Sequence, residues 1–169
     1  MPDATTNPAV IMPRHKILSF YGVPTTSEGT TTVTFHRMKK FTQLSQAKNP
    51  QEYSRKYVDE ATQRTDVTGF APQIDYAFDR HKNNPVLTDI VDITNRELIG
   101  SEAIRTIINV DTETGEAYKR DYAVVPGSEG DDANIYTHSG SFKANGEVIK
   151  GTASSSDDWQ TITFTEESE

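Results

Sequence analysis

The stretch Asn84–Gly100 (NPVLTDIVDITNRELIG) is the one segment of this chain whose pattern clearly predicts a helix. Asn84 is a favourable N-cap because its side chain can accept a hydrogen bond from a free backbone N–H group. Pro85 suits the first helical position because it has no N–H group to leave unpaired. Gly100 can adopt the left-handed conformation that ends a helix. The stretch therefore predicts a helix at about residues 85–99.

The apolar residues of this helix recur at spacings of three and four and form one stripe. An amphipathic helix cannot bury such a stripe alone, so it has to pack against a sheet or barrel made by the flanking strands. The predicted packing face consists of Leu87, Ile90, Val91 and Leu98.

Most of the remaining sequence alternates apolar and polar residues, which is typical of strands. The segment EYSRKYVDE is also compatible with a helix, and a strand is favoured because Tyr and Val prefer pleated surfaces. Asn145-Gly146 predicts a tight hairpin turn. The predicted fold class is mainly β, an antiparallel β-sandwich or barrel of seven or eight strands with one flanking α-helix. The expected strands lie at about residues 30–41, 52–60, 69–79, 104–110, 117–125, 135–144, 147–153 and 159–165.

Two segments lack this alternation. Residues 1–30 contain four prolines and many threonines, which predicts an N-terminal arm or loop ahead of a single domain at 31–167. A polar excursion around Asn49-Pro50 predicts a loop tip between two strands. The residues of that predicted loop are Leu44, Ser45, Gln46, Ala47, Lys48, Asn49, Pro50 and Gln51.

Composition excludes several classes of function. A net charge of −8 and a pI near 5.0 argue against a protein that holds nucleic acid through phosphate contacts. The chain has no cysteine, which excludes disulfides, thiolate catalysis and cysteine-ligated metals. It has neither an apolar run long enough to span a membrane nor a signal-peptide pattern, so we expect synthesis in a bacterial cytoplasm and no membrane partner.

The sequence shows no catalytic, cofactor-binding or metal-binding motif, and we expect a protein that is not an enzyme. Its four histidines (His15, His36, His81 and His138) lack the spacing of a metal site or catalytic triad. The acidic turns Asp111–Gly115 and Glu129–Asp132 only partly match a calcium loop, and turn chemistry accounts for both. The basic run at Arg37, Lys39 and Lys40 is interpreted as a strand face or subunit contact.

An ordered set of segments resembles the major tail tube proteins of long-tailed phages and prophages of Gram-positive bacteria. These segments are KFTQLSQAKNPQEYSRKYVDE, DVTGFAPQIDYAFD, NPVLTDIVDIT, EAYKRDYAVVPGSEGDDANIYTHSGSFKANGEVIKGT and WQTITF, within residues 17–167. The resemblance implies a β-sandwich or barrel with a flanking helix, and six copies per ring. It further implies that rings stack into a hollow virion tube through which DNA passes during ejection.

The same resemblance implies the partners. These are further copies of the chain and other tail proteins, such as the tape measure, tail terminator and distal tail proteins, with DNA as a transient passenger. In such a family the excursion at Leu44–Gln51 reaches the neighbouring ring, and wet-faced strands such as Gly69–Asp79 and those after the helix line the lumen. Two other classes remain open, a non-catalytic carbohydrate- or protein-binding β-sandwich and a β-fold hydrolase with paired carboxylates.

Overall fold

The computed structural model describes residues 9–168 of the chain, and the first eight residues of the predicted arm lie outside them. The described part contains one α-helix, α1 (Pro85–Arg96), and short 3₁₀ turns at Arg14–Lys16 and Gly100–Ala103. Its strands are β1 (Ile17–Ser27), β2 (Thr30–Arg37), β3 (Phe41–Ala47), β4 (Pro50–Arg55), β5 (Arg64–Phe70), β6 (Gln73–Asp79), β7 (Ile104–Asp111), β8 (Glu116–Glu129), β9 (Thr137–Ala144), β10 (Ile149–Ser154) and β11 (Thr161–Glu166).

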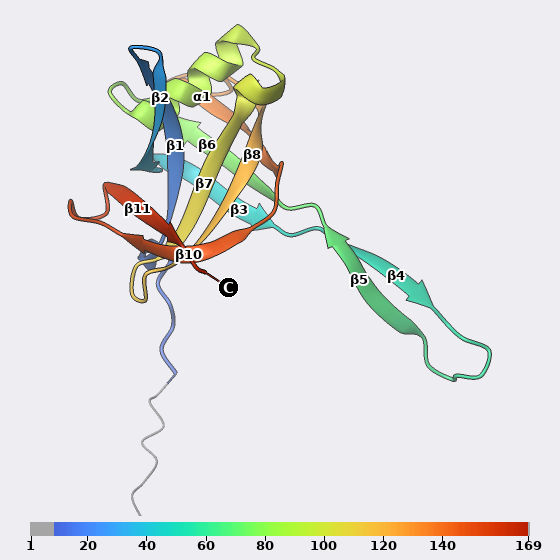
Figure 1. Cartoon of the computed structure of the whole chain (residues 1–169). Helices are drawn as coiled ribbons and strands as arrows, with labels where there is room; N and C mark the ends of the chain where they lie inside the picture. The colour runs from blue at the N-terminus through green and yellow to red at the C-terminus, as the bar shows by residue number, and fades with distance from the viewer. Residues whose placement is uncertain (1–8, 169) are drawn as a thin grey trace, which may run out of the picture.

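Nine of these strands form one antiparallel sheet in the order β10-β11-β2-β1-β7-β8-β9-β6-β3, and β10 also pairs with β8 (Figure 1). The long strand β8 gives residues 116–119 to β10 and residues 122–129 to β9. Strands β8, β10, β11, β2, β1 and β7 therefore close on one another, while β9, β6 and β3 continue the sheet on the other side. Strands β4 and β5 form a separate two-stranded sheet.

Strands β1 and β7 separate two hydrophobic cores. Neighbouring residues on each strand point to opposite faces, so Phe20 and Ile108 enter one core while Tyr21 and Ile107 enter the other, and all four side chains have no exposed surface. The smaller core fills the closed group of strands. The larger core lies between β1, β7, β8, β9, β6 and helix α1. Apolar pairs such as Ile107-Ile108 are typical of strands covered on both faces.

Helix α1 begins as the sequence predicts and ends earlier. The Asn84 side chain accepts hydrogen bonds from the backbone N–H groups of Val86 and Leu87, at 3.2 and 3.3 Å. The helix ends at Arg96 because Glu97 takes the left-handed conformation, with φ of 51°. Gly100 has φ of 61° but lies in the following 3₁₀ turn and is not the residue that closes the helix.

The packing face of α1 is the predicted one with two additions. Leu87, Ile90 and Val91 are buried, and Leu98 packs against the larger core from just beyond the helix. Val86 and Ile93 are buried as well.

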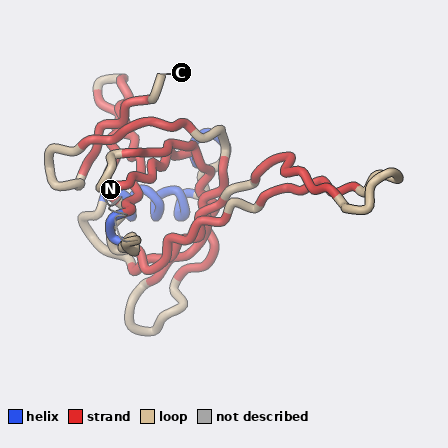
Figure 2. Tube along the Cα trace, turned by 90° about the horizontal axis from the view of Figure 1, so that it is seen from below, coloured by secondary structure: helices blue, strands red, loops and turns tan. Residues whose placement is uncertain are grey.

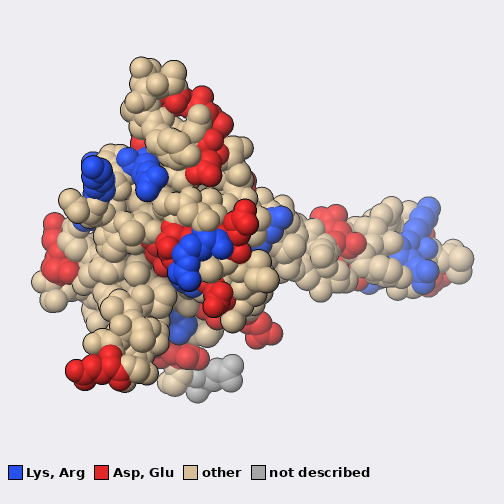
Figure 3. All heavy atoms as spheres, turned by 90° about the horizontal axis from the view of Figure 1, so that it is seen from above, with Lys and Arg blue, Asp and Glu red and all other residues tan. Residues whose placement is uncertain are grey.

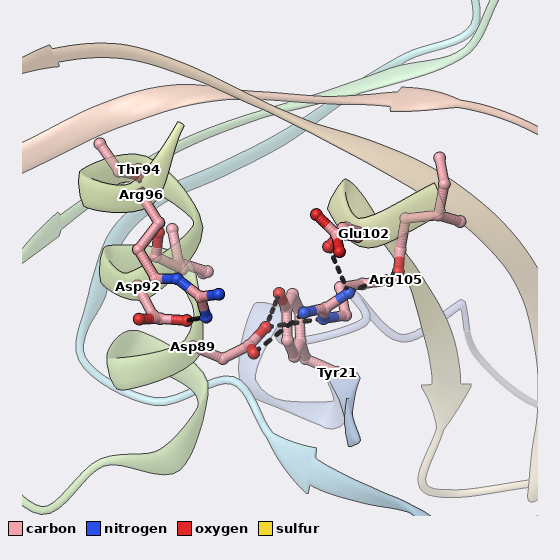
Figure 4. A network of polar contacts seen from close by, with 9 residues as sticks. Tyr21, Asp89, Asp92, Thr94, Arg96, Glu102 and Arg105 are labelled. Atoms are coloured by element: carbon pink, nitrogen blue, oxygen red, sulfur yellow. Dashed lines mark hydrogen bonds and ion pairs between the residues drawn. The ribbon is translucent and has the colours of Figure 1, made fainter. Parts of the chain in front are cut away.

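A largely buried polar network fastens the helix to the sheet (Figure 4). The Tyr21 hydroxyl on β1 donates to Asp89 on α1 at 2.5 Å, and the Arg105 guanidinium on β7 donates to both oxygens of Asp89, at 2.8 and 3.2 Å. Burial, together with the Asp89 charge, raises the pKa of Tyr21 well above its ordinary value, so the hydroxyl remains a donor. Arg105 also donates to the backbone carbonyls of Glu102 and Ile104.

Two expectations from the sequence need correction. Residues 17–27, expected within an arm or loop, form strand β1, because Phe20 and Tyr21 supply apolar anchors on both faces of the sheet. Asn145-Gly146 does not close a hairpin, because β9 and β10 pair one after the other along the same edge of β8 and not with each other. The Asn145 N–H group donates to Asp121 of β8 instead.

The expected fold class is confirmed. Every strand pair in the described residues is antiparallel, and one α-helix flanks the sheet. The expected single strand at 69–79 is divided between β5 and β6, and eleven strands replace the expected seven or eight.

Val91 and Asp92 are neighbours on α1 with opposite surroundings, and their substitution tests the packing face. Val91→Asp places an unpaired charge in the larger core and should lower the free energy of unfolding by about 3 kcal/mol or more. Asp92→Ala removes only an exposed ion pair with Arg96 and should cost less than about 1 kcal/mol. Urea unfolding measures both, and equal losses would contradict the assigned face.

The Tyr21–Asp89–Arg105 network can be tested with a double-mutant cycle. Asp89→Leu or Arg105→Met alone leaves a buried charge without its partner and should cost about 3–5 kcal/mol. The double variant should lose less than the sum of the two, because neither unpaired charge is left. Additive losses in chemical denaturation would show that the two groups do not stabilise each other.

Candidate assembly surfaces

The described residues offer surfaces for contact more readily than a reaction centre. Within residues 9–168, no group of three or more His, Asp or Glu side chains is arranged to hold a metal ion. The helix found there is too short and too polar to cross a membrane. His36 on β2 and His81, which contacts the Asp79 carbonyl, line one cavity beside the start of α1. The other two histidines lie elsewhere: His15 is exposed in the first 3₁₀ turn and His138 is buried on β9.

The most prominent surface is a hairpin arm, which we define as residues 48–72 and which contains β4 and β5. It projects from the end of β3 and the start of β6, well away from the rest of the chain (Figures 1 and 2). Except for Glu60, Gly69 and Pro72, its residues between Asn49 and Pro72 are exposed. An isolated two-stranded ribbon is marginally stable in water, so the arm draws little stability from its own contacts.

Local hydrogen bonds hold the two sides of the arm together. At its base, Asn49 adopts a positive φ of 45°, its carbonyl accepts from the Ala71 N–H group, and its side-chain amide donates to the Ala71 carbonyl at 3.0 Å. Midway along the arm, the hydroxyls of Ser54 and Thr65 lie 2.9 Å apart across the strands. Near the tip, Arg64 makes two hydrogen bonds to Glu60, at 2.6 and 2.7 Å.

The register of the arm sorts its exposed side chains onto two faces. Pairing of Pro50 with Phe70 and of Glu52 with Val67 places these residues on one face, where Phe70 is 61% exposed and Val67 56%. Tyr53 pairs with Asp66 and lies on the other face. At the tip, Tyr57 is half exposed and Val58 is fully exposed. Apolar side chains of this size, gathered on one projection, mark a contact surface.

The structure places the residues of the predicted loop at the start of this arm. Leu44, Ser45, Gln46 and Ala47 belong to β3, Lys48 and Asn49 form the link, and Pro50 and Gln51 begin β4. The loop tip predicted at Asn49-Pro50 is therefore wrong, because the chain leaves the main sheet there and turns back only at residues 56–63. The signal for the longer excursion was the segment Arg64–Phe70, whose Thr65, Val67 and Thr68 are β-branched and which pairs with β4.

A second surface is a basic groove beside the start of β3. It is a cavity of about 770 Å³, and its charged lining residues are Arg14, Arg37, Lys39 and Lys40. An adjoining cavity of about 280 Å³ adds Lys82 and the beginning of α1. Neither cavity is lined by Asp or Glu, although acidic residues outnumber basic ones by 25 to 17 in the chain. The basic run seen in the sequence therefore belongs to a concave surface at the β2–β3 link.

His138 is the buried polar side chain of the described core. Its ring stacks on Phe78 at a centroid distance of 5.1 Å, and its Nδ1 lies 3.6 Å from the Glu129 carboxylate. Its Nε2 has no hydrogen-bond partner among the described residues. Burial lowers the pKa of His138 below its ordinary value, the Glu129 charge opposes this shift, and the Arg80 charge adds to it.

Comparison with known proteins gives a distant structural likeness. No family model matches the sequence, and no curated protein matches it. Among solved structures, the chain is similar to a chain of the anti-feeding prophage (AFP) baseplate, determined by cryo-EM and 6-fold symmetrised. The two are 7% identical with a TM-score of 0.46, over 84% of this chain and 96% of that chain. Such a loose likeness does not carry the function of the baseplate to this chain.

His138 should make the protein less stable in mild acid. Because its pKa is lower in the folded than in the unfolded chain, the unfolded chain binds the proton more readily once the pH falls below about 6.5. Stability should therefore decrease between pH 7 and pH 5, and His138→Phe should reduce that decrease. His36→Gln serves as the second variant, because burial also lowers the pKa of His36. Thermal melts that change identically with pH in wild type and both variants would contradict this assignment.

Proposed function

We propose that this chain is a structural subunit of a phage tail tube. Copies form rings, with six as the number that the sequence resemblance implies, and the rings stack around a lumen through which DNA passes during ejection. In the virion the tube contacts other tail proteins, including the tape measure, tail terminator and distal tail proteins. The subunit performs no catalysis. Its work is to assemble and to line a passage.

The hairpin arm is the observation that carries this proposal. It is a long ribbon without a core of its own, and it exposes Tyr57, Val58, Val67 and Phe70. A monomer gains nothing from such a projection, because the ribbon loses conformational freedom without burying apolar surface in return. A contact with a neighbouring ring supplies that burial. The stacking role predicted for Leu44–Gln51 is accordingly proposed for the whole arm into which these residues lead.

The sheet offers an edge for joining subunits within a ring. Strand β3 pairs with β6 on one side only, and no other described strand covers its outer edge. Unpaired edges invite pairing with another chain, and a closed ring of subunits removes them. Edge pairing at β3 therefore accounts for ring formation, while the arm accounts for stacking.

The face of β3, β6 and β9 that points away from the larger core suits a water-filled lumen. The side chains of this face are mostly uncharged, as at the paired positions Ser45, Ser141, Ala77 and Ser139, and its charged members are Asp75, Asp79 and Lys143. Strand β7, expected to line the lumen, is unsuited to that role because Ile107 and Ile108 are both fully buried. A surface of few cations, in a chain of net charge −8, has little means of holding DNA phosphates, so DNA can slide past.

One observation favours a second candidate function, a non-catalytic binding module for protein or carbohydrate. Tyr53, Tyr57 and Tyr136 are each about half exposed. Exposed aromatic residues near loop tips are typical of such modules. The two candidates differ in what they bind, because a tube subunit binds its own copies whereas a binding module remains monomeric in the absence of its ligand.

Shortening the arm should abolish assembly and leave the fold intact. Glu52 and Val67 are paired neighbours, so residues 53–66 can be replaced by Asn-Gly, which closes a two-residue hairpin turn. The nine-stranded sheet loses no pairing, and circular dichroism and thermal melts should match those of the wild type. Negative-stain micrographs should show rings and tubes for the wild type and no tubes for the shortened chain.

A variant with the arm kept at full length provides the control. Thr62→Ser changes an exposed residue of the tip without altering charge or length, and it should assemble normally. Tubes of normal length from a folded, shortened chain would show that rings stack through another surface. A wild-type chain that forms neither rings nor tubes would favour the binding module.

A further inference from the structure

The outer end of the arm combines exposed apolar residues with positive charge. Arg55 and Lys56 are exposed beside Tyr57 and Val58. Arg64 is held by Glu60, so these two charges neutralise each other, and Asp59 offsets only one of the remaining cations. Figure 3 shows Lys and Arg side chains gathered near the outer end of the arm. This end therefore fits a partner that is acidic and partly apolar.

The loop between β8 and β9, residues 130–136, has the matching composition. Asp131 and Asp132 are exposed, and Ile135 and Tyr136 are each about half exposed. Asp132 accepts hydrogen bonds from the N–H groups of Asn134 and Ile135, at 2.7 and 3.1 Å, and these bonds lower its pKa and keep it charged. The loop is thus a preformed acidic surface beside two apolar side chains.

The register of the sheet keeps the arm and this loop of one chain apart. Strand β6 pairs with β9 so that Gln73 lies opposite Lys143 and Asp79 lies opposite Thr137. The arm leaves the sheet just before Gln73, whereas the loop precedes Thr137 at the other end of the same strand pair. At about 3.3 Å per residue, the two sites are separated by roughly 20 Å of strand, with the arm directed away from the body.

We propose that the outer end of the arm binds the β8–β9 loop of a second copy of this chain. Arg55 and Lys56 face Asp131 and Asp132 of that copy, while Tyr57 and Val58 pack on Ile135 and Tyr136. The contact is head-to-tail, because the two surfaces differ and lie at opposite ends of β6. A contact of that kind closes into a ring or continues as a stack. This inferred contact rests on the proposed self-assembly and adds to it the surface of the second copy that receives the arm.

The distribution of charge along the chain supports this partner. Residues 48–72 contain four basic and four acidic residues, so the arm is neutral and the rest of the chain carries the whole net charge of −8. The acidic parts of two copies outside their arms repel each other. A neutral arm with a basic end is not repelled in this way and can reach the acidic surface of a second copy. The arm thus bridges copies at the distance where their repulsion is screened by salt.

Paired charge variants test the contact. The arm variant is Arg55→Glu/Lys56→Glu, and the loop variant is Asp131→Lys/Asp132→Asn, in which Asn keeps the oxygen that accepts from residues 134 and 135. Each variant alone should self-associate at least tenfold more weakly than the wild type in sedimentation velocity, because like charges then face each other. Mixed one to one, the two variants should associate again, because the normal arm of the loop variant meets the normal loop of the arm variant. The reversed charges of the other arm and loop attract each other as well.

Glu113→Lys/Glu147→Gln is the matched control, because it changes the net charge as the loop variant does, at exposed residues of other loops. Circular dichroism establishes that each variant is folded. Undiminished self-association of both variants would overturn this contact and leave the tail-tube proposal standing. Weak association of both without recovery in the mixture would also overturn it, and a wild-type chain that never self-associates would reject the contact and the proposed function together.

Discussion

The fold depends on strand β8, which shares one of its two edges between two partner strands. A strand has two edges, and β8 gives one of them to β7 and the other first to β10 and then to β9. The division allows one strand to belong to two groups, a closed one around the smaller core and an open one that holds helix α1. Each core alone is small, and sharing β1, β7 and β8 lets a polar chain bury apolar residues on both faces of its central strands.

That arrangement decides which parts of the molecule remain available for contact. The strands of the closed group pair with one another around the smaller core, and the Tyr21–Asp89–Arg105 network holds the helix in place. The outer edge of β3 and the arm that continues from it remain open, and so do the outer edges of residues 22–27 on β1 and 30–34 on β2. The edge of β3 and the arm lie on one continuous stretch of sequence, residues 41–72.

The sequence predicts local features of this fold well and pairing poorly. The Asn84 cap, the apolar stripe of α1 and most strand positions follow from residues close to one another in the chain. The partner of a strand does not, which is why Asn145-Gly146 suggested a hairpin although β9 and β10 both pair with β8. The sequence does not predict the arm for a related reason. Its strands are exposed to solvent on both faces, so they need no alternation of apolar and polar residues that a pattern search could detect.

The pairing of β11 with β2 has a consequence for how the protein is made. His36 pairs with Thr161 and Phe35 with Ile162, so an early strand waits for a late one before its second edge is covered. Contacts between residues so distant in sequence slow folding, because the loop between them must be closed first. During synthesis on the ribosome, the outer edge of β2 therefore stays unpaired until β11 emerges, and in that interval it can pair with a strand of another nascent chain.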